Sequence, residues 1–104
     1  MSKGIVLLHG AGLGGWIWDA VQPHLGERVI AIDLHGPGGI DRREATLARC
    51  ADHVLEQVQG WSEVVVVGHS VSGALALEVA SRLGERAVEV ILVGAVVPPS
   101  AVAR

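Results

Sequence analysis

The stretch VVVVGHSVSG, residues 64–73, joins a run of four valines to a helical pattern through a turn that holds a histidine and two serines. A short apolar run without polar alternation is typical of a parallel strand covered on both faces. The apolar positions from Val71 to Leu83, followed by Gly84, predict a central helix. The stretch therefore predicts strand, tight turn and helix, with Ser70 as either a nucleophile on the turn or a cap of the helix.

Apolar and helical patterns alternate along the rest of the chain. Three further apolar runs predict parallel strands, at residues 4–9, 29–33 and 90–97. Helices are predicted at 16–25 and 46–59, although Pro23 disfavours the last turn of the first. The order βαβαβαβ predicts one α/β domain over residues 1–104, an open, doubly wound and mostly parallel sheet. Ligands bind such sheets at the carboxyl ends of their strands, where the glycine-rich loops lie.

Composition limits the function classes. The chain has 104 residues, of which 50% are hydrophobic and 18% charged, with a net charge of -3, so a globular domain is expected. Its Lys and Arg residues are scattered, which argues against a nucleic-acid partner. The single Cys50 is expected to be buried and inert. The apolar run before His9 is too short for a signal sequence or a membrane span, so we expect a cytoplasmic protein with no membrane association.

The first glycine-rich loop also fits a different site. Gly10, Gly12 and Gly15 have GxGxxG spacing after a strand, and Asp33 ends the next strand. This is the context of a Rossmann-type dinucleotide site, in which the glycines approach the pyrophosphate and the carboxylate holds a ribose hydroxyl. The histidine directly before the loop is not a requirement of that site. In the alternative, Asp33 fixes the following turn at 36–39.

Four segments together resemble the α/β-hydrolase superfamily, and within it the small esterase and hydroxynitrile-lyase-like branch. They are LLHGAGLGGWIW (7–18), IDLHGPGGID (32–41), VVVVGHSVSG (64–73) and VEVILVGAVVPPS (88–100). The resemblance implies a serine hydrolase of small carboxylic esters or amides, or a lyase on the same scaffold. It implies Ser70 as the nucleophile and an oxyanion hole formed by the backbone N–H groups of Ala11 and Val71. It implies no cofactor and no metal.

The turn around Ser70 needs small neighbours, because side chains two residues before and after the nucleophile meet nearby backbone. Gly68 meets this need, whereas Ser72 stands where glycine is usual, so we expect a slightly loosened turn with Ser72 as a second-choice nucleophile. His69 is expected to pack beside the turn. His9, before Gly10, is expected to hydrogen-bond to the backbone of its own loop, with a role for His9 or His35 as a substitute base left as an alternative.

The resemblance also implies an acid and a general-base histidine after later strands, and residues 98–104 contain neither. We therefore expect a domain truncated after its fourth strand, weak or inactive unless another chain supplies the pair. The strand Val90 to Val97 would then present an unpaired apolar edge, which predicts a homo-oligomer joined there. A non-catalytic fragment that acts only through strand pairing is the remaining possibility.

Overall fold

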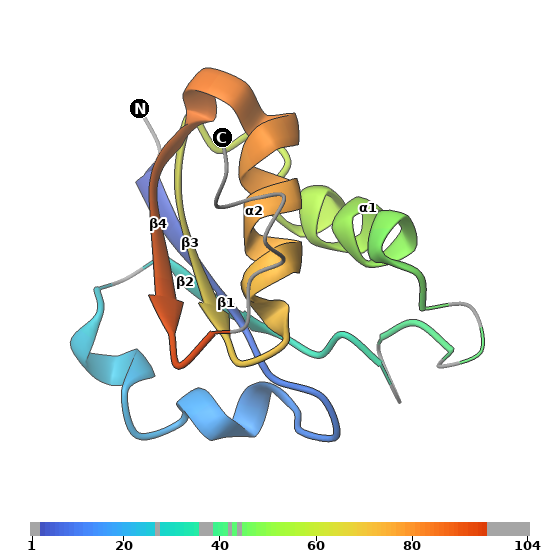
Figure 1. Ribbon diagram of the computed structural model, residues 1–104. Coiled ribbons are helices and arrows are strands. Elements are labelled where there is room, and N and C mark those ends of the chain that lie inside the picture. The colour runs from blue at the N-terminus through green and yellow to red at the C-terminus, as the bar shows by residue number, and fades with distance from the viewer. Residues whose placement is uncertain (1–2, 27, 36–38, 42, 44, 96–104) are drawn as a thin grey trace.

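A parallel four-stranded sheet organises the chain in the computed structural model, which describes residues 3–26, 28–35, 39–41, 43 and 45–95 (Figure 1). Its strands are β1 (Lys3–Leu8), β2 (Val29–Ile32), β3 (Glu63–His69) and β4 (Ala87–Val93). They lie in the order β2-β1-β3-β4, and every neighbouring pair is parallel. The predicted open parallel α/β fold is confirmed. The last strand begins earlier than predicted, and the end of the predicted run, residues 96–97, lies outside the described residues.

Both faces of the central strands are covered, which explains their lack of polar alternation. Helices α1 (Leu47–Gln57) and α2 (Ser72–Leu83) lie on one face (Figure 1). The core on this side includes Val6, Leu8, Val54, Val64, Val66, Leu75 and Val79. On the other face Leu7, Val65 and Val67 pack with Trp18.

Two of the three predicted helices form. Helix α1 begins after Thr46, whose side-chain oxygen accepts a hydrogen bond from the N–H of Arg49 at 3.1 Å. The predicted helix at 16–25 is wrong: the segment forms two short 3₁₀ turns, η1 (Gly15–Trp18) and η2 (Gln22–His24). Pro23 sits at the start of the second turn and cannot donate a helical hydrogen bond. A further 3₁₀ turn, η4 (Gly84–Arg86), joins α2 to β4.

The strand order places two loops together. From β1 the chain moves outward to β2, then returns across β1 to form β3 and continues outward to β4. The loops after β1 and β3 therefore leave neighbouring strands at the point where the direction of winding reverses. This switch point is where open α/β sheets bind their ligands. Residues 9–15 and 68–73 are therefore the candidate ligand-binding loops of this fold.

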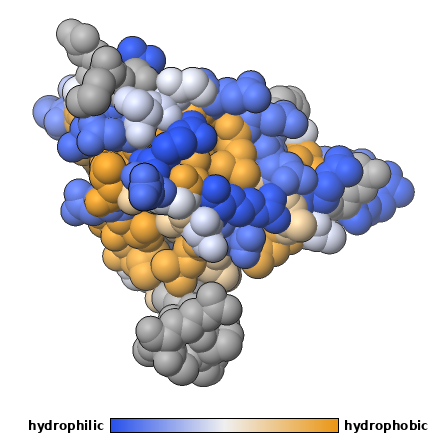
Figure 2. All heavy atoms as spheres, turned by 90° about the horizontal axis from the view of Figure 1, so that it is seen from above, coloured by the Kyte–Doolittle hydropathy of each residue, from blue (hydrophilic) through white to orange (hydrophobic). Residues whose placement is uncertain are grey.

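Strand β4 forms one border of the sheet. Val88, Ile91, Leu92 and Val93 are 40–44% exposed, and β4 pairs only with β3 among the described strands. Seen from above, apolar side chains reach the surface on the side of the molecule where β4 lies, among largely hydrophilic neighbours (Figure 2). None of the described helices is both long and apolar enough to cross a membrane.

Candidate active site

The turn after β3 holds Ser70 in a strained conformation. Its φ of 57° is the only positive value at a non-glycine position among the described residues. A left-handed conformation costs a residue with a side chain about 1–2 kcal/mol, and such strain is concentrated at functional sites. The Ser70 N–H donates to the carbonyl of Val93 at 3.1 Å, and its own carbonyl accepts from the N–H of Gly73 at 3.1 Å. The end of β4 and the start of α2 therefore hold this turn.

Gly68 lets α2 approach β3 closely at the same turn. A Cβ atom at this position would lie 2.6 Å from the carbonyl oxygen of Ser72 and 2.8 Å from the Cβ of Ala76. Neither distance is compatible with a side chain, so glycine is required by packing. This is the collision expected two residues before a nucleophile on a strand–turn–helix elbow.

Ser72 ties the turn to the neighbouring strand. Its side chain is 4% exposed, and its hydroxyl donates to the backbone carbonyl of His9 at 2.5 Å. The expected loosening of the turn is therefore replaced by a hydrogen bond between the start of α2 and the end of β1. The sequence held no signal for this contact, because its two partners are 63 residues apart.

His9 is built into the loop that follows β1. It is 1% exposed, and its Nε2 accepts a hydrogen bond from the N–H of Leu34 at 3.0 Å. Nδ1 therefore carries the proton of the neutral ring and donates to the carbonyl of Gly10 at 2.7 Å. The expected bond to loop backbone is present. Because both ring nitrogens are engaged, His9 is poorly suited to act as a base.

The loop after β1 rests against the turn after β3. A Cβ at Gly10 would lie 3.1 Å from both the His69 Nδ1 and the Ser70 Cβ, so glycine permits the close approach. His69 packs edge-on against Trp18, with ring centroids 6.2 Å apart, which agrees with the packing role expected for it. The Nδ1 of His69 and the Nε1 of Trp18 are buried without a hydrogen-bond partner in the described part of the chain.

Asp33 reaches across to the first loop. Its Oδ1 accepts a hydrogen bond from the N–H of Gly15 at 2.8 Å. The prediction that Asp33 fixes the turn at 36–39 falls on residues 36–38, which lie outside the described residues. The dinucleotide alternative is not supported, because the loop leads into a four-residue 3₁₀ turn rather than a helix whose N-terminus could face a pyrophosphate.

Two backbone donors lie free beside the elbow. Ala11 and Val71 are exposed, and their N–H groups find no acceptor among the described residues. Both residues line a pocket of about 280 Å³, whose wall also includes Cys50. Cys50 is therefore half-buried at a pocket rather than sealed in the core as expected, and burial raises the pKa of its thiol.

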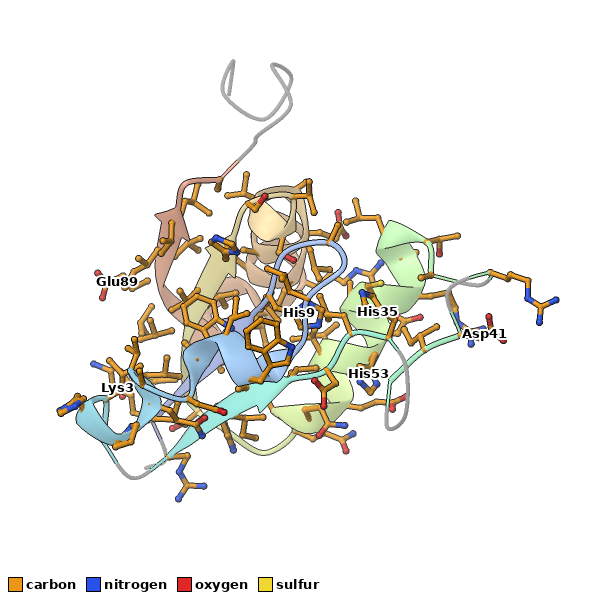
Figure 3. All side chains as sticks on the ribbon, turned by 90° about the horizontal axis from the view of Figure 1, so that it is seen from below. Lys3, His9, His35, Asp41, His53 and Glu89 are labelled. Atoms are coloured by element: carbon orange, nitrogen blue, oxygen red, sulfur yellow. The ribbon has the colours of Figure 1, made fainter. Side chains whose placement is uncertain are left out.

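Two histidines meet near this pocket. The rings of His9 and His35 lie edge to face with centroids 5.2 Å apart. His53 lies on α1 and is not part of this pair (Figure 3). His35 is half-exposed and lines the pocket. Within the described ranges, no group of three or more His, Cys, Asp or Glu side chains could hold a metal ion.

The fold and the site define a parallel α/β domain with a serine on a strand–turn–helix elbow at the switch point of the sheet. Residues 5–104 match the model of the alpha/beta hydrolase family, and the chain belongs to that family.

Known relatives and structures agree with this assignment. The pimeloyl-[acyl-carrier protein] methyl ester esterase of Aromatoleum aromaticum is 38% identical over 86% of this chain, which spans 36% of that protein. Methylesterase 8 of Arabidopsis thaliana is 38% identical over 70% of the chain, which spans 30% of it. The crystal structure of the pyrethroid hydrolase PytH with BIF superimposes with a TM-score of 0.81 at 28% identity, covering 92% of this chain and 41% of that one. The chain thus spans about a third of these curated relatives.

Proposed function

We propose that this chain carries the nucleophile and the oxyanion hole of an esterase-type serine hydrolase that acts on small carboxylic esters. The observation that carries the proposal is the positive φ of Ser70, which holds a serine on a tight turn beside two free backbone donors. The names of two relatives, an acyl-carrier-protein methyl ester esterase and a methylesterase, support an ester substrate.

In the proposed reaction the turn after β3 supplies the nucleophile Ser70, and the two oxyanion donors come from that turn and from the loop after β1. The Ser70 hydroxyl attacks the ester carbonyl, and its proton passes to a general base. The N–H groups of Ala11 and Val71 donate to the oxygen that gains negative charge, and one such donor is typically worth about 3 kcal/mol in the transition state. The alcohol leaves, and water then releases the acid from the serine.

We propose that the base and its acid lie outside the described residues. His9 has both ring nitrogens in hydrogen bonds, and His69 packs against Trp18. Without the base and acid, a serine hydrolase keeps only about 10³–10⁴-fold acceleration over water, from the oxyanion hole and binding. The chain alone is therefore expected to turn over esters very slowly.

Fluorophosphonate labelling tests the nucleophile directly. With the rest of a longer relative supplied as a second chain, intact-mass measurement of the folded chain is expected to show a single adduct, which disappears in Ser70→Ala and persists in Ser72→Ala. Ser72→Ala is the matched control because the two serines lie two residues apart on the same turn. An adduct that persists in Ser70→Ala, or no adduct on folded protein even when the rest of a longer relative is supplied as a second chain, would contradict the proposal.

We also propose that the outer edge of β4 pairs with a second copy of the chain. Its backbone groups have no partner strand among the described residues, and Ile91 is 41% exposed beside other apolar side chains. Unpaired apolar edges are templates for further pairing. Sedimentation is expected to show a dimer or larger species that Ile91→Lys dissociates. Val21→Lys is the control, because Val21 is 43% exposed but lies away from β4; a monomer at high concentration would refute the pairing.

A further inference from the structure

Two polar ring atoms are buried together on the second face of the sheet. Trp18 is 8% exposed, and its indole Nε1 has no hydrogen-bond partner among the described residues. His69 is half-buried as a residue, but its Nδ1 is buried and has no partner there either. Buried polar atoms are nearly always hydrogen-bonded, because leaving one unpaired is costly, so this pair of atoms needs an explanation.

The two atoms have complementary roles in hydrogen bonding. An indole N–H can only donate, whereas a neutral imidazole has one nitrogen that accepts. The rings of Trp18 and His69 lie edge to face, with centroids 6.2 Å apart and an interplanar angle of 86°. This ring contact therefore encloses one donor and one acceptor, which do not bond to each other directly.

The ring contact lies between the loop after β1 and the sheet. A Cβ at Gly10 would lie 3.1 Å from the His69 Nδ1 and 3.5 Å from its Cε1, so the backbone of Gly10 lies close to this edge of the imidazole. Three buried strand residues pack with Trp18 on the side of the sheet: Leu7, Val65 and Val67. The indole N–H is therefore shielded from bulk solvent, and its partner has to be held inside the protein.

We propose that one internal water joins the Trp18 N–H to the His69 Nδ1. The water accepts from the indole and donates to the imidazole, so the neutral imidazole carries its own proton on Nε2. Buried waters in proteins ordinarily bind groups of this kind, which protein atoms leave unpaired.

The bridge makes His69 a positioning residue. It ties the residue before Ser70 to η1, the turn that ends the loop after β1, and so holds the loop and the elbow together. The inference goes beyond the proposed function, because no step of ester hydrolysis passes through this water.

Nuclear magnetic resonance of the ¹⁵N-labelled chain tests for the water directly. The measurement is made in slightly alkaline solution, where an imidazole ordinarily keeps one nitrogen unprotonated. The Trp18 Hε1 is expected to show a cross-peak to a long-lived water, with the sign of a direct contact rather than of proton exchange. A Trp18 Hε1 without such a contact would overturn the proposal.

Two substitutions at His69 separate the bridge from the packing of the ring. His69→Phe keeps a ring beside Trp18 but removes the acceptor, so the water contact should be lost and exchange of the indole proton should accelerate about tenfold. His69→Asn keeps an acceptor at the δ position, so the water contact should be retained. Trp61 is the control in both spectra, because it is also 8% exposed but packs against Gly4 at the opposite end of β1.

The positioning role has its own readout in the loop. The Leu13 N–H donates to the Gly10 carbonyl at 3.2 Å, so its exchange with solvent reports on the loop. Exchange at Leu13 should accelerate in His69→Phe and stay close to the parent rate in His69→Asn. Equal behaviour of the two variants, in the water contact or in the exchange at Leu13, would overturn the proposal.

Trp18→Phe tests the bridge from the donor side, and it decides the matter if a variant at His69 fails to fold. The ¹⁵N resonance of the His69 Nδ1 should shift when the indole N–H is removed, whereas the ring of His9, which has its proton on Nδ1, should keep its resonances. An unchanged His69 Nδ1 would contradict the bridge. None of these readouts needs ester turnover, so a failure of the bridge and a failure of the proposed hydrolase are distinguishable.

Discussion

The loop after β1 and the turn after β3 meet at the same edge of the sheet, but they are held in opposite ways. The turn is shaped locally, by the positive φ of Ser70 and the space that Gly68 leaves for α2. The loop is shaped from a distance, by hydrogen bonds with the Leu34 N–H, the Ser72 hydroxyl and the Asp33 carboxylate. Backbone strain therefore positions the proposed nucleophile, whereas hydrogen bonds to distant residues position the proposed oxyanion donor Ala11.

The largest effect is expected when the tether at His9 is removed. In His9→Leu the buried Leu34 N–H and Gly10 carbonyl both lose their partner, and each buried group without a partner costs about 1–3 kcal/mol. We expect the free energy of unfolding in urea to fall by about 3 kcal/mol. His53→Leu is the control on α1, where a change within about 0.5 kcal/mol is expected. Equal losses in the two variants would mean that the loop does not depend on the ring nitrogens.

A smaller loss is expected when the local packing of the turn is disturbed. In Gly68→Ala the new methyl group meets the Ser72 carbonyl oxygen at 2.6 Å and must push α2 away from β3. Overpacking of this kind costs about 1–3 kcal/mol, and we expect about 2 kcal/mol in urea unfolding.

Gly60→Ala distinguishes this packing effect from the general cost of losing a glycine. Gly60 has a φ of 85°, and no atom lies within 4 Å of the place that a Cβ would take, so only backbone strain of about 1 kcal/mol is expected there. A Gly68→Ala loss no larger than that of Gly60→Ala would contradict the close approach of α2.

The smallest effect is expected at Asp33, whose side chain is exposed. Asp33→Ala removes the acceptor of the Gly15 N–H and should cost about 1 kcal/mol. Amide hydrogen exchange should accelerate at Gly15 while the amides of β3 keep their protection. Asp19→Ala, also exposed, is the control; acceleration at Gly15 in that variant as well would show that the Asp33 carboxylate does not hold the loop.

The same contrast explains what the sequence could predict. The strands and the two long helices follow from local apolar patterns, and the requirement for glycine at position 68 follows from the geometry of a tight turn. The role of Ser72 and the contact between Asp33 and Gly15 depend on partners 63 and 18 residues away, which no local pattern indicates. The predicted helix at 16–25 failed for a related reason, because Ile17 and Leu25 pack against the second face of the sheet from two short 3₁₀ turns that their spacing could not reveal.

The two serines of the turn provide the most direct test. Ser70→Gly relieves a positive φ, so we expect the free energy of unfolding to rise by about 1 kcal/mol. Ser72→Gly removes the buried donor to the His9 carbonyl, so we expect a fall of about 1–2 kcal/mol. Urea unfolding of both variants beside the parent chain measures the two changes in one experiment. Opposite signs would support a strained Ser70 beside a tethering Ser72, and a loss of stability in both variants would contradict that division.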